Sequence, residues 1–100
     1  MKILHLTLQK KWFDLILSGK KKVEIREYKP YWVARLVDDR GEGRHFDIVR
    51  FKNGYGTNAP TMDLEFKGIS FTTPEFYTPE HGEQIWPETI LIRLGGVLAW

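Results

Sequence analysis

A short basic stretch near the N-terminus contains the side chains best suited to chemistry. It reads Gly19-Lys20-Lys21-Lys22-Val23-Glu24-Ile25-Arg26, a basic turn that leads into a strand with charges at alternate positions. Successive side chains of a strand point to opposite faces, so we expect Val23 and Ile25 to be buried in a core. Lys22, Glu24 and Arg26 then share the other face. That face lines a cleft or, as the alternative, is a solvated strand edge with a weak surface ion pair.

A carboxylate beside a guanidinium offers complementary hydrogen bonds to a nucleobase. Glu24 can accept from an exocyclic amine or ring N–H, and Arg26 can donate to a carbonyl oxygen or a phosphate. Lys20 and Lys22 flank Lys21 in the sequence, and adjacent like charges disfavour its protonated form. We expect Lys21 to be an exposed turn lysine. If its like-charged neighbours leave it neutral for part of the time, it acts as a general base or nucleophile; otherwise it is a fully charged contact to phosphate or solvent.

Aromatic side chains supply the stacking surface that base recognition needs. Those in or beside expected loops are Tyr28, Tyr31, Trp32 and Tyr55. Those assigned to the core are Trp12, Phe13, Phe51 and Phe66. Stacking of a base on an aromatic ring is worth roughly 1 to 3 kcal/mol. Tyr28, Trp32 and Tyr55 are therefore candidate ligand-binding residues, although core filling alone also explains the tryptophans.

The spacing of Gly19, Lys21, Glu24 and Arg26 resembles the G-x-K-x-x-E-x-R motif of the ASCH family (activating signal cointegrator homology). This family is a branch of the PUA-like superfamily of RNA-associated β-barrels. Its motif follows a first strand and a first helix, and this chain offers both. Looser similarity to small bacterial and phage members continues through Lys29-Pro30-Tyr31-Trp32 and Asn53-Gly54-Tyr55. The resemblance implies one domain over residues 1–100, with a helix packed against the end of a partly open barrel.

Some small bacterial ASCH proteins are amidohydrolases that deacetylate N4-acetylcytidine. The resemblance places their lysine on Lys21 and their arginine on Arg26, but their threonine falls on Glu24. Their second glutamate comes from a later segment, and the sequence leaves its counterpart open. The candidates are Glu75, Glu80 and Glu83. The change at Glu24 removes a hydroxyl nucleophile, while a Lys21/Glu24 pair still provides a means of activating water.

Three functions compete on these observations. The first is binding of RNA or a modified nucleoside in a cleft lined by Lys21, Glu24 and Arg26, with Lys20 and Lys22 as further ligand contacts. The second is a small amidohydrolase of acylated nucleosides, with Lys21 and Glu24 as its catalytic residues. The third is a protein-interaction domain whose basic patch meets an acidic partner. A polar strand face inside a cleft favours the first two. We favour the first of these, because the missing threonine at position 24 weakens the second.

Hydropathy patterns place short strands and helices around the basic stretch. Strands are expected at 3–8, 22–26, 46–52, 62–71 and 89–94, a helix at 9–18, and a short second helix or irregular turn at 31–37 after Pro30. Gly68 is expected to mark a bulge, and Gly95-Gly96 a bend after the last strand. Residues 72–87 contain three prolines and several glutamates and are expected to form a loop over a barrel mouth. The pattern predicts a mixed α+β fold of five to six strands, a PUA-like partly open barrel.

Composition narrows the setting of this fold. The chain has 100 residues, 42% hydrophobic and 28% charged, which suits one compact domain. Residues 1–52 hold 13 Lys and Arg against 7 Asp and Glu, whereas residues 53–100 hold 2 against 6, so the half with the motif attracts phosphates. No cysteine and three scattered histidines predict no metal or cofactor. Without a signal peptide or an apolar run of about 18 residues, we expect a cytoplasmic protein with no membrane partner.

Overall fold

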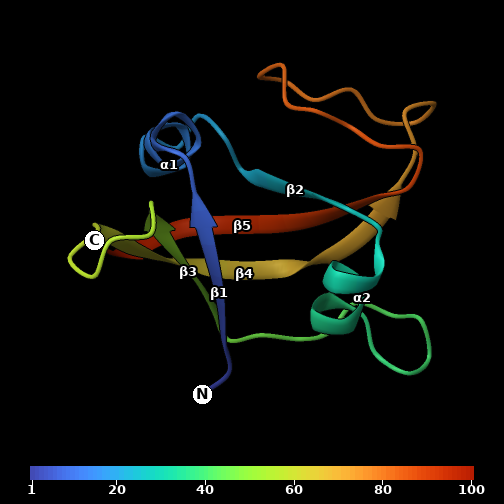
Figure 1. Cartoon of the computed structure of the whole chain (residues 1–100), viewed down its shortest axis with the longest axis horizontal. Coiled ribbons are helices and arrows are strands. Elements are labelled where there is room, and N and C mark those ends of the chain that lie inside the picture. The colour runs from blue at the N-terminus through green and yellow to red at the C-terminus, as the bar shows by residue number, and fades with distance from the viewer.

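A five-stranded sheet curls into a half-barrel, with one helix at each end of its open side (Figure 1). The computed structural model describes residues 1–100. Its elements are β1 (Ile3–Leu8), α1 (Lys10–Leu17), β2 (Val23–Glu27), α2 (Pro30–Leu36), β3 (Ile48–Asn53), β4 (Thr61–Thr72) and β5 (Thr89–Ala99). The strand order is β1-β3-β4-β5-β2, so β1 and β2 are the two free edges. This confirms the expected α+β class and partly open barrel.

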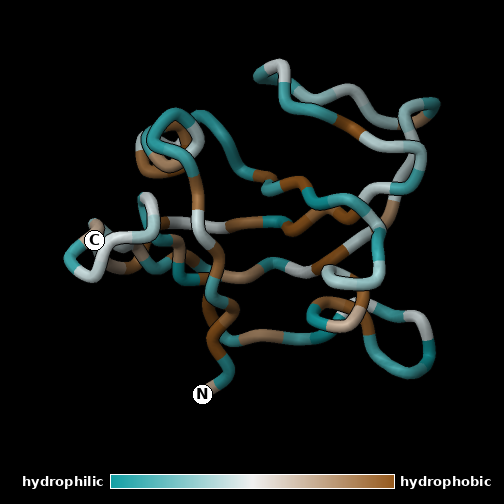
Figure 2. Tube along the Cα trace, in the orientation of Figure 1, coloured by the Kyte–Doolittle hydropathy of each residue, from teal (hydrophilic) through white to brown (hydrophobic).

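Alternating leucines explain why β1 packs on one face only. Leu4, Leu6 and Leu8 are buried and pair in parallel with β3, while all other neighbouring strands are antiparallel. Phe13 and Ile16 of α1 lie one turn apart on the same side and are buried in the same core. Hydrophobic segments accordingly follow the strands and the inner side of α1, and the connecting loops are hydrophilic (Figure 2).

The two faces of β2 lie in different environments, and the expected orientation of its side chains needs correction. Ile25 is buried as expected, but Val23 is only half-buried. Cross-strand partners share a face, and Glu24 pairs with Ile92 while Ile25 pairs with Leu91. Ile92 belongs to the main core cluster, whereas Ile25 and Leu91 do not. Arg26 likewise pairs with Ile90 of the core cluster. Glu24 and Arg26 therefore lie on the core face of the half-barrel, at its open edge, rather than opposite the core.

The last strand is longer than expected. β5 continues through Gly95 and Gly96 to Ala99 instead of ending at Leu94. A Cβ on Gly95 would lie 2.7 Å from the Cβ of Glu65, so the glycine allows β4 and β5 to approach closely. The expected irregularity at Gly68 is confirmed, because this residue has φ +121° and the pairing register shifts beside it.

Residues 73–88, which we name the strap, connect β4 to β5 without any helix or strand. In Figure 1 the strap is the orange segment that runs back over the side of β2. Its end is fixed by a hydrogen bond from the Tyr28 amide to the Glu88 carbonyl, 3.0 Å. The expected loop is thus confirmed. Neither helix of the chain has the length and hydrophobicity needed to cross a membrane.

Candidate functional site

The turn after α1 directs Lys21 into the protein. Gly19 adopts φ +81°, as expected for a glycine that ends a helix. The amides of Lys20 and Lys21 then both donate to the Leu15 carbonyl, each at 3.0 Å, which folds the turn back under the helix. Lys21 is consequently only 3% exposed. The expectation of an exposed turn lysine is wrong, because the backbone of the turn is tied to the last turn of α1.

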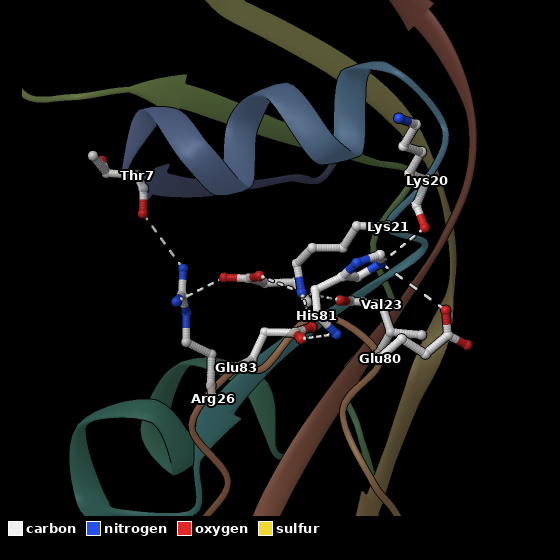
Figure 3. A network of polar contacts seen from close by, with 9 residues as sticks. Thr7, Lys20, Lys21, Val23, Arg26, Glu80, His81 and Glu83 are labelled. Atoms are coloured by element: carbon white, nitrogen blue, oxygen red, sulfur yellow. Dashed lines mark hydrogen bonds and ion pairs between the residues drawn. The ribbon is translucent and has the colours of Figure 1, made fainter.

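Carboxylates, not lysines, surround the buried ammonium group. Lys21 Nζ lies 2.8 Å from Glu83 Oε2 and 3.6 Å from Glu24 Oε1, and it donates to the Val23 carbonyl at 2.6 Å (Figure 3). The side chains of Lys20 and Lys22 are exposed. The like-charge argument from the sequence therefore does not describe this site, since the nearest charged groups are the carboxylates of Glu83 and Glu24.

Arg26 joins the two edges of the half-barrel. Its Nη1 lies 2.7 Å from Glu24 Oε2, and its Nη2 donates to the Thr7 carbonyl of β1 at 3.4 Å (Figure 3). The guanidinium carbon also lies 4.9 Å from the centroid of the Trp32 ring. Its Nε is buried without a hydrogen-bond partner. Arg26 is thus held in place by three groups while one of its donors stays free.

The four charged side chains form one chain of alternating sign. Arg26, Glu24, Lys21 and Glu83 follow one another, so the two cations balance the two carboxylates. Exposure of their side chains ranges from 2% for Lys21 to 18% for Arg26. Buried charges of this kind depend on one another, because removal of one member leaves its neighbour without compensation.

Glu83 shows how the network fixes a charge state. Burial alone would raise the pKa of its carboxyl. Hydrogen bonds from Lys21 and from the backbone outweigh burial, so the pKa of Glu83 lies below its usual value of 4.5. The amide of His81 is one of these donors, at 2.7 Å. Glu83 is therefore ionised at neutral pH.

A cleft of about 280 Å³ opens onto this network. Its lining residues are Trp12, Lys21, Glu24, Ile25, Arg26, Glu83, Gln84 and Trp86. The walls come from α1, β2 and the strap, and two half-buried indole side chains share the lining with the charged groups. Such a cleft offers hydrogen-bond donors, acceptors and flat apolar surfaces within one small space.

The structure brings together only part of the expected site. Lys21, Glu24 and Arg26 line the cleft, whereas Lys20 and Lys22 line an adjoining hollow of about 240 Å³ on the other side of Lys21. Other residues of this hollow are Tyr77, Glu80 and His81. The two lysines therefore stand beside the cleft and not in it.

The three expected aromatic contacts are also dispersed. Trp32 packs against the core and reaches the site only through Arg26. Tyr28 lies beside Phe71 beyond the end of β2. Tyr55 is 89% exposed in the connection between β3 and β4. Neither tyrosine lines the cleft.

Trp12, Glu83 and Trp86 are cleft residues that sequence reasoning missed or left undecided. The helical spacing that Trp12 shares with Phe13 and Ile16 predicts a core position. Trp12 does pack against the core, but it also lines the cleft. Among the later glutamates only Glu83 contacts Lys21, and the sequence held no signal that favours it over its neighbours. Trp86 lies three residues further along the same strap, so one loop conformation places both.

Comparisons of this chain with protein-family models, curated proteins and solved structures found no match. No group of three or more His, Cys, Asp or Glu side chains is close enough together to hold a metal ion. The cleft itself contributes carboxylates, cations and indoles. These groups suit a planar, polar ligand that both donates and accepts hydrogen bonds.

Proposed function

We propose that the cleft binds a nucleoside, in modified or unmodified form, either free or as part of RNA. The observation that carries this proposal is the ion pair of Glu24 and Arg26, 2.7 Å apart, in a cleft that Trp12 and Trp86 also line. A carboxylate accepts from the exocyclic amine of a cytosine-like base, and a guanidinium donates to a carbonyl oxygen.

The size of the cleft favours one nucleoside over a longer segment. Its volume of about 280 Å³ is at the small end for ligand pockets. The indoles of Trp12 and Trp86 provide flat surfaces on which a base can stack, as in proteins that bind unpaired bases. The residue pattern resembles the ASCH motif, and we propose that the chain is an RNA-associated member of that family.

Binding measurements on matched variants test this proposal. We expect cytidine, N4-acetylcytidine or a short single-stranded RNA to bind and to quench tryptophan fluorescence. Trp86→Ala should weaken binding by about 1 to 3 kcal/mol through lost stacking. Trp100→Ala is the matched control, because Trp100 is 84% exposed and does not line the cleft. Failure of all three ligands to bind, or equal losses in both variants, would overturn the proposal.

The contact between Lys21 and Glu83 favours hydrolysis of an acylated nucleoside as a second candidate. Glu83 Oε2 lies 2.8 Å from Lys21 Nζ. Glu83 is therefore our candidate for the second catalytic glutamate that the resemblance to the ASCH amidohydrolases implies. In this reaction a water oxygen attacks the acetyl carbonyl carbon while a carboxylate, Glu83 or Glu24, takes the water proton. The Lys21 ammonium stabilises the oxyanion. The C–N4 bond then breaks, the proton passes to N4, and acetate and cytidine leave.

Turnover separates the second candidate from the first. Hydrolysis predicts release of cytidine from N4-acetylcytidine and a lower rate in Glu83→Gln, which keeps the side-chain shape and loses the base. Tight binding of N4-acetylcytidine without any release of cytidine would mean that the chain is a binder. The absence of threonine at position 24 would then be the physical reason.

A further inference from the structure

A second pocket lies at the opposite end of β2 from Lys21, where Tyr28, directly after β2, meets the end of β4 and the start of β5. Its volume is about 490 Å³. The lining residues are Tyr28, Phe71, Thr72, Thr73, Phe76, Glu88 and Thr89, and we name this site the aromatic pocket. It shares no lining residue with the cleft, so it is a separate site.

Three aromatic rings with open surfaces line this pocket. Tyr28 and Phe71 stand nearly perpendicular, with ring centroids 5.7 Å apart and an interplanar angle of 83°. Phe76 is 79% exposed, although its amide hydrogen bond to the Thr73 carbonyl, 3.1 Å, holds its backbone in a turn. The face of an aromatic ring carries partial negative charge. Solvent-facing rings set at an angle thus present a concave, electron-rich surface.

The only charged residue of the pocket is also negative. Glu88 is exposed, and its carboxylate takes part in none of the salt bridges of the chain. The hydroxyl of Thr73 has no hydrogen-bond partner either. No lysine or arginine lines the pocket to neutralise it. The pocket therefore combines electron-rich ring faces with a carboxylate and has no cationic side chain in its lining.

We propose that the aromatic pocket binds an organic ammonium cation. A cation within about 6 Å of a ring centroid is attracted by the ring face, and aromatic cages of this kind recognise alkylated ammonium groups. Glu88 adds a full negative charge to the attraction. A nucleotide is the less suitable occupant, because its phosphate would meet the carboxylate of Glu88. The same head group occurs in free amines and on modified lysine side chains.

Choline and 3,3-dimethylbutan-1-ol make the sharpest pair of probes, since they share one shape and only choline is charged. Chemical shifts of the wild-type protein, measured at constant ionic strength, should show saturable choline binding with a Kd on the order of millimolar at residues of the aromatic pocket. The neutral alcohol should bind at least about fivefold more weakly, the factor that corresponds to about 1 kcal/mol. Nα-acetyl-Nε-trimethyllysine amide tests whether the pocket also binds the alkylated ammonium group of a modified lysine side chain.

Variants of the same pocket show which groups are responsible. Phe76→Leu keeps an apolar side chain without a ring face and should weaken choline binding about fivefold; Glu88→Gln should weaken it as well. Tyr55→Leu is the matched control, because Tyr55 is also largely exposed, at 89% against 79% for Phe76, and lies in another loop. Equal affinity for choline and the neutral alcohol, no binding of either, or binding of cytidine at this pocket in place of choline would each overturn the proposal.

Discussion

Lys21 is the residue on which the candidate cleft depends. Its ammonium group contacts Glu83 and Glu24, and its backbone amide is tied to α1. An amine this deeply buried is held in a fixed position by its partners, which is what both recognition and catalysis need. The same burial makes the residue part of the fold, so its loss affects stability as well as function.

Lys21→Met should lower the free energy of unfolding by about 3 kcal/mol or more, because it leaves two buried carboxylates without their shared cation. Lys22→Met, the adjacent exposed lysine, should change it by less than about 0.5 kcal/mol. Chemical denaturation measures both. Adding Glu83→Gln to Lys21→Met should restore part of the loss, since the uncompensated charge is then removed. Equal stability of the two single variants would show that the buried ion pairs do not form in solution.

At the scale of elements, strands and helices with a clear hydrophobic period were predictable. The strap was predictable as a loop, but the path it takes across the half-barrel was not. β1 and α1 follow from alternating leucines and from apolar residues one helical turn apart. The position of Glu83 depends on where a proline-containing loop of 16 residues, 73–88, folds back. No local pattern encodes that, because the contact joins residues 62 positions apart in the chain. Burial of Lys21 was missed for a different reason, because it follows from the turn after Gly19, whose amides donate to the Leu15 carbonyl.

Polar contacts from Glu83 and His81 help to attach the strap to the half-barrel, so its attachment should respond to acid. The pKa of Glu83 is depressed from 4.5 by its hydrogen bonds, and a depressed carboxyl stabilises the folded state above its unfolded pKa. This contribution is complete above about pH 5 and is lost as pH falls through the folded pKa. Stability measured from pH 6 to pH 3 should therefore fall less steeply in Glu83→Gln than in the wild type.

Asp63→Asn is the comparison for this pH series. Hydrogen bonds from Arg50 likewise depress the pKa of Asp63, but that pair lies on β3 and β4, away from the strap. Asp63→Asn should flatten the dependence of stability on pH without changing proteolytic cleavage within residues 73–88. Glu83→Gln should increase that cleavage at neutral pH. A Glu83→Gln profile as steep as that of the wild type would contradict the assigned ion pair.

At the scale of the whole molecule, charge is divided between inside and outside. The buried network of Arg26, Glu24, Lys21 and Glu83 contains two cations and two carboxylates. Attraction of a phosphate backbone must therefore come from exposed cations such as Lys20 and Lys22, which line the hollow next to the cleft. Under the proposed function, the cleft would bind the nucleoside and the lysines beside it would contact the phosphates of an RNA.

This division predicts different salt dependence for two ligands. RNA binding should weaken steeply as salt rises, and Lys20→Gln combined with Lys22→Gln should reduce the slope of log K against log salt by about 1.4, at about 0.7 per phosphate of a single strand. Affinity for uncharged cytidine should stay the same in this double variant. Lys67→Gln, an exposed lysine of β4, is the control and should leave both ligands unaffected. A slope that the double variant does not change would mean that phosphates do not pass over these lysines, and a nucleoside would then be the whole ligand.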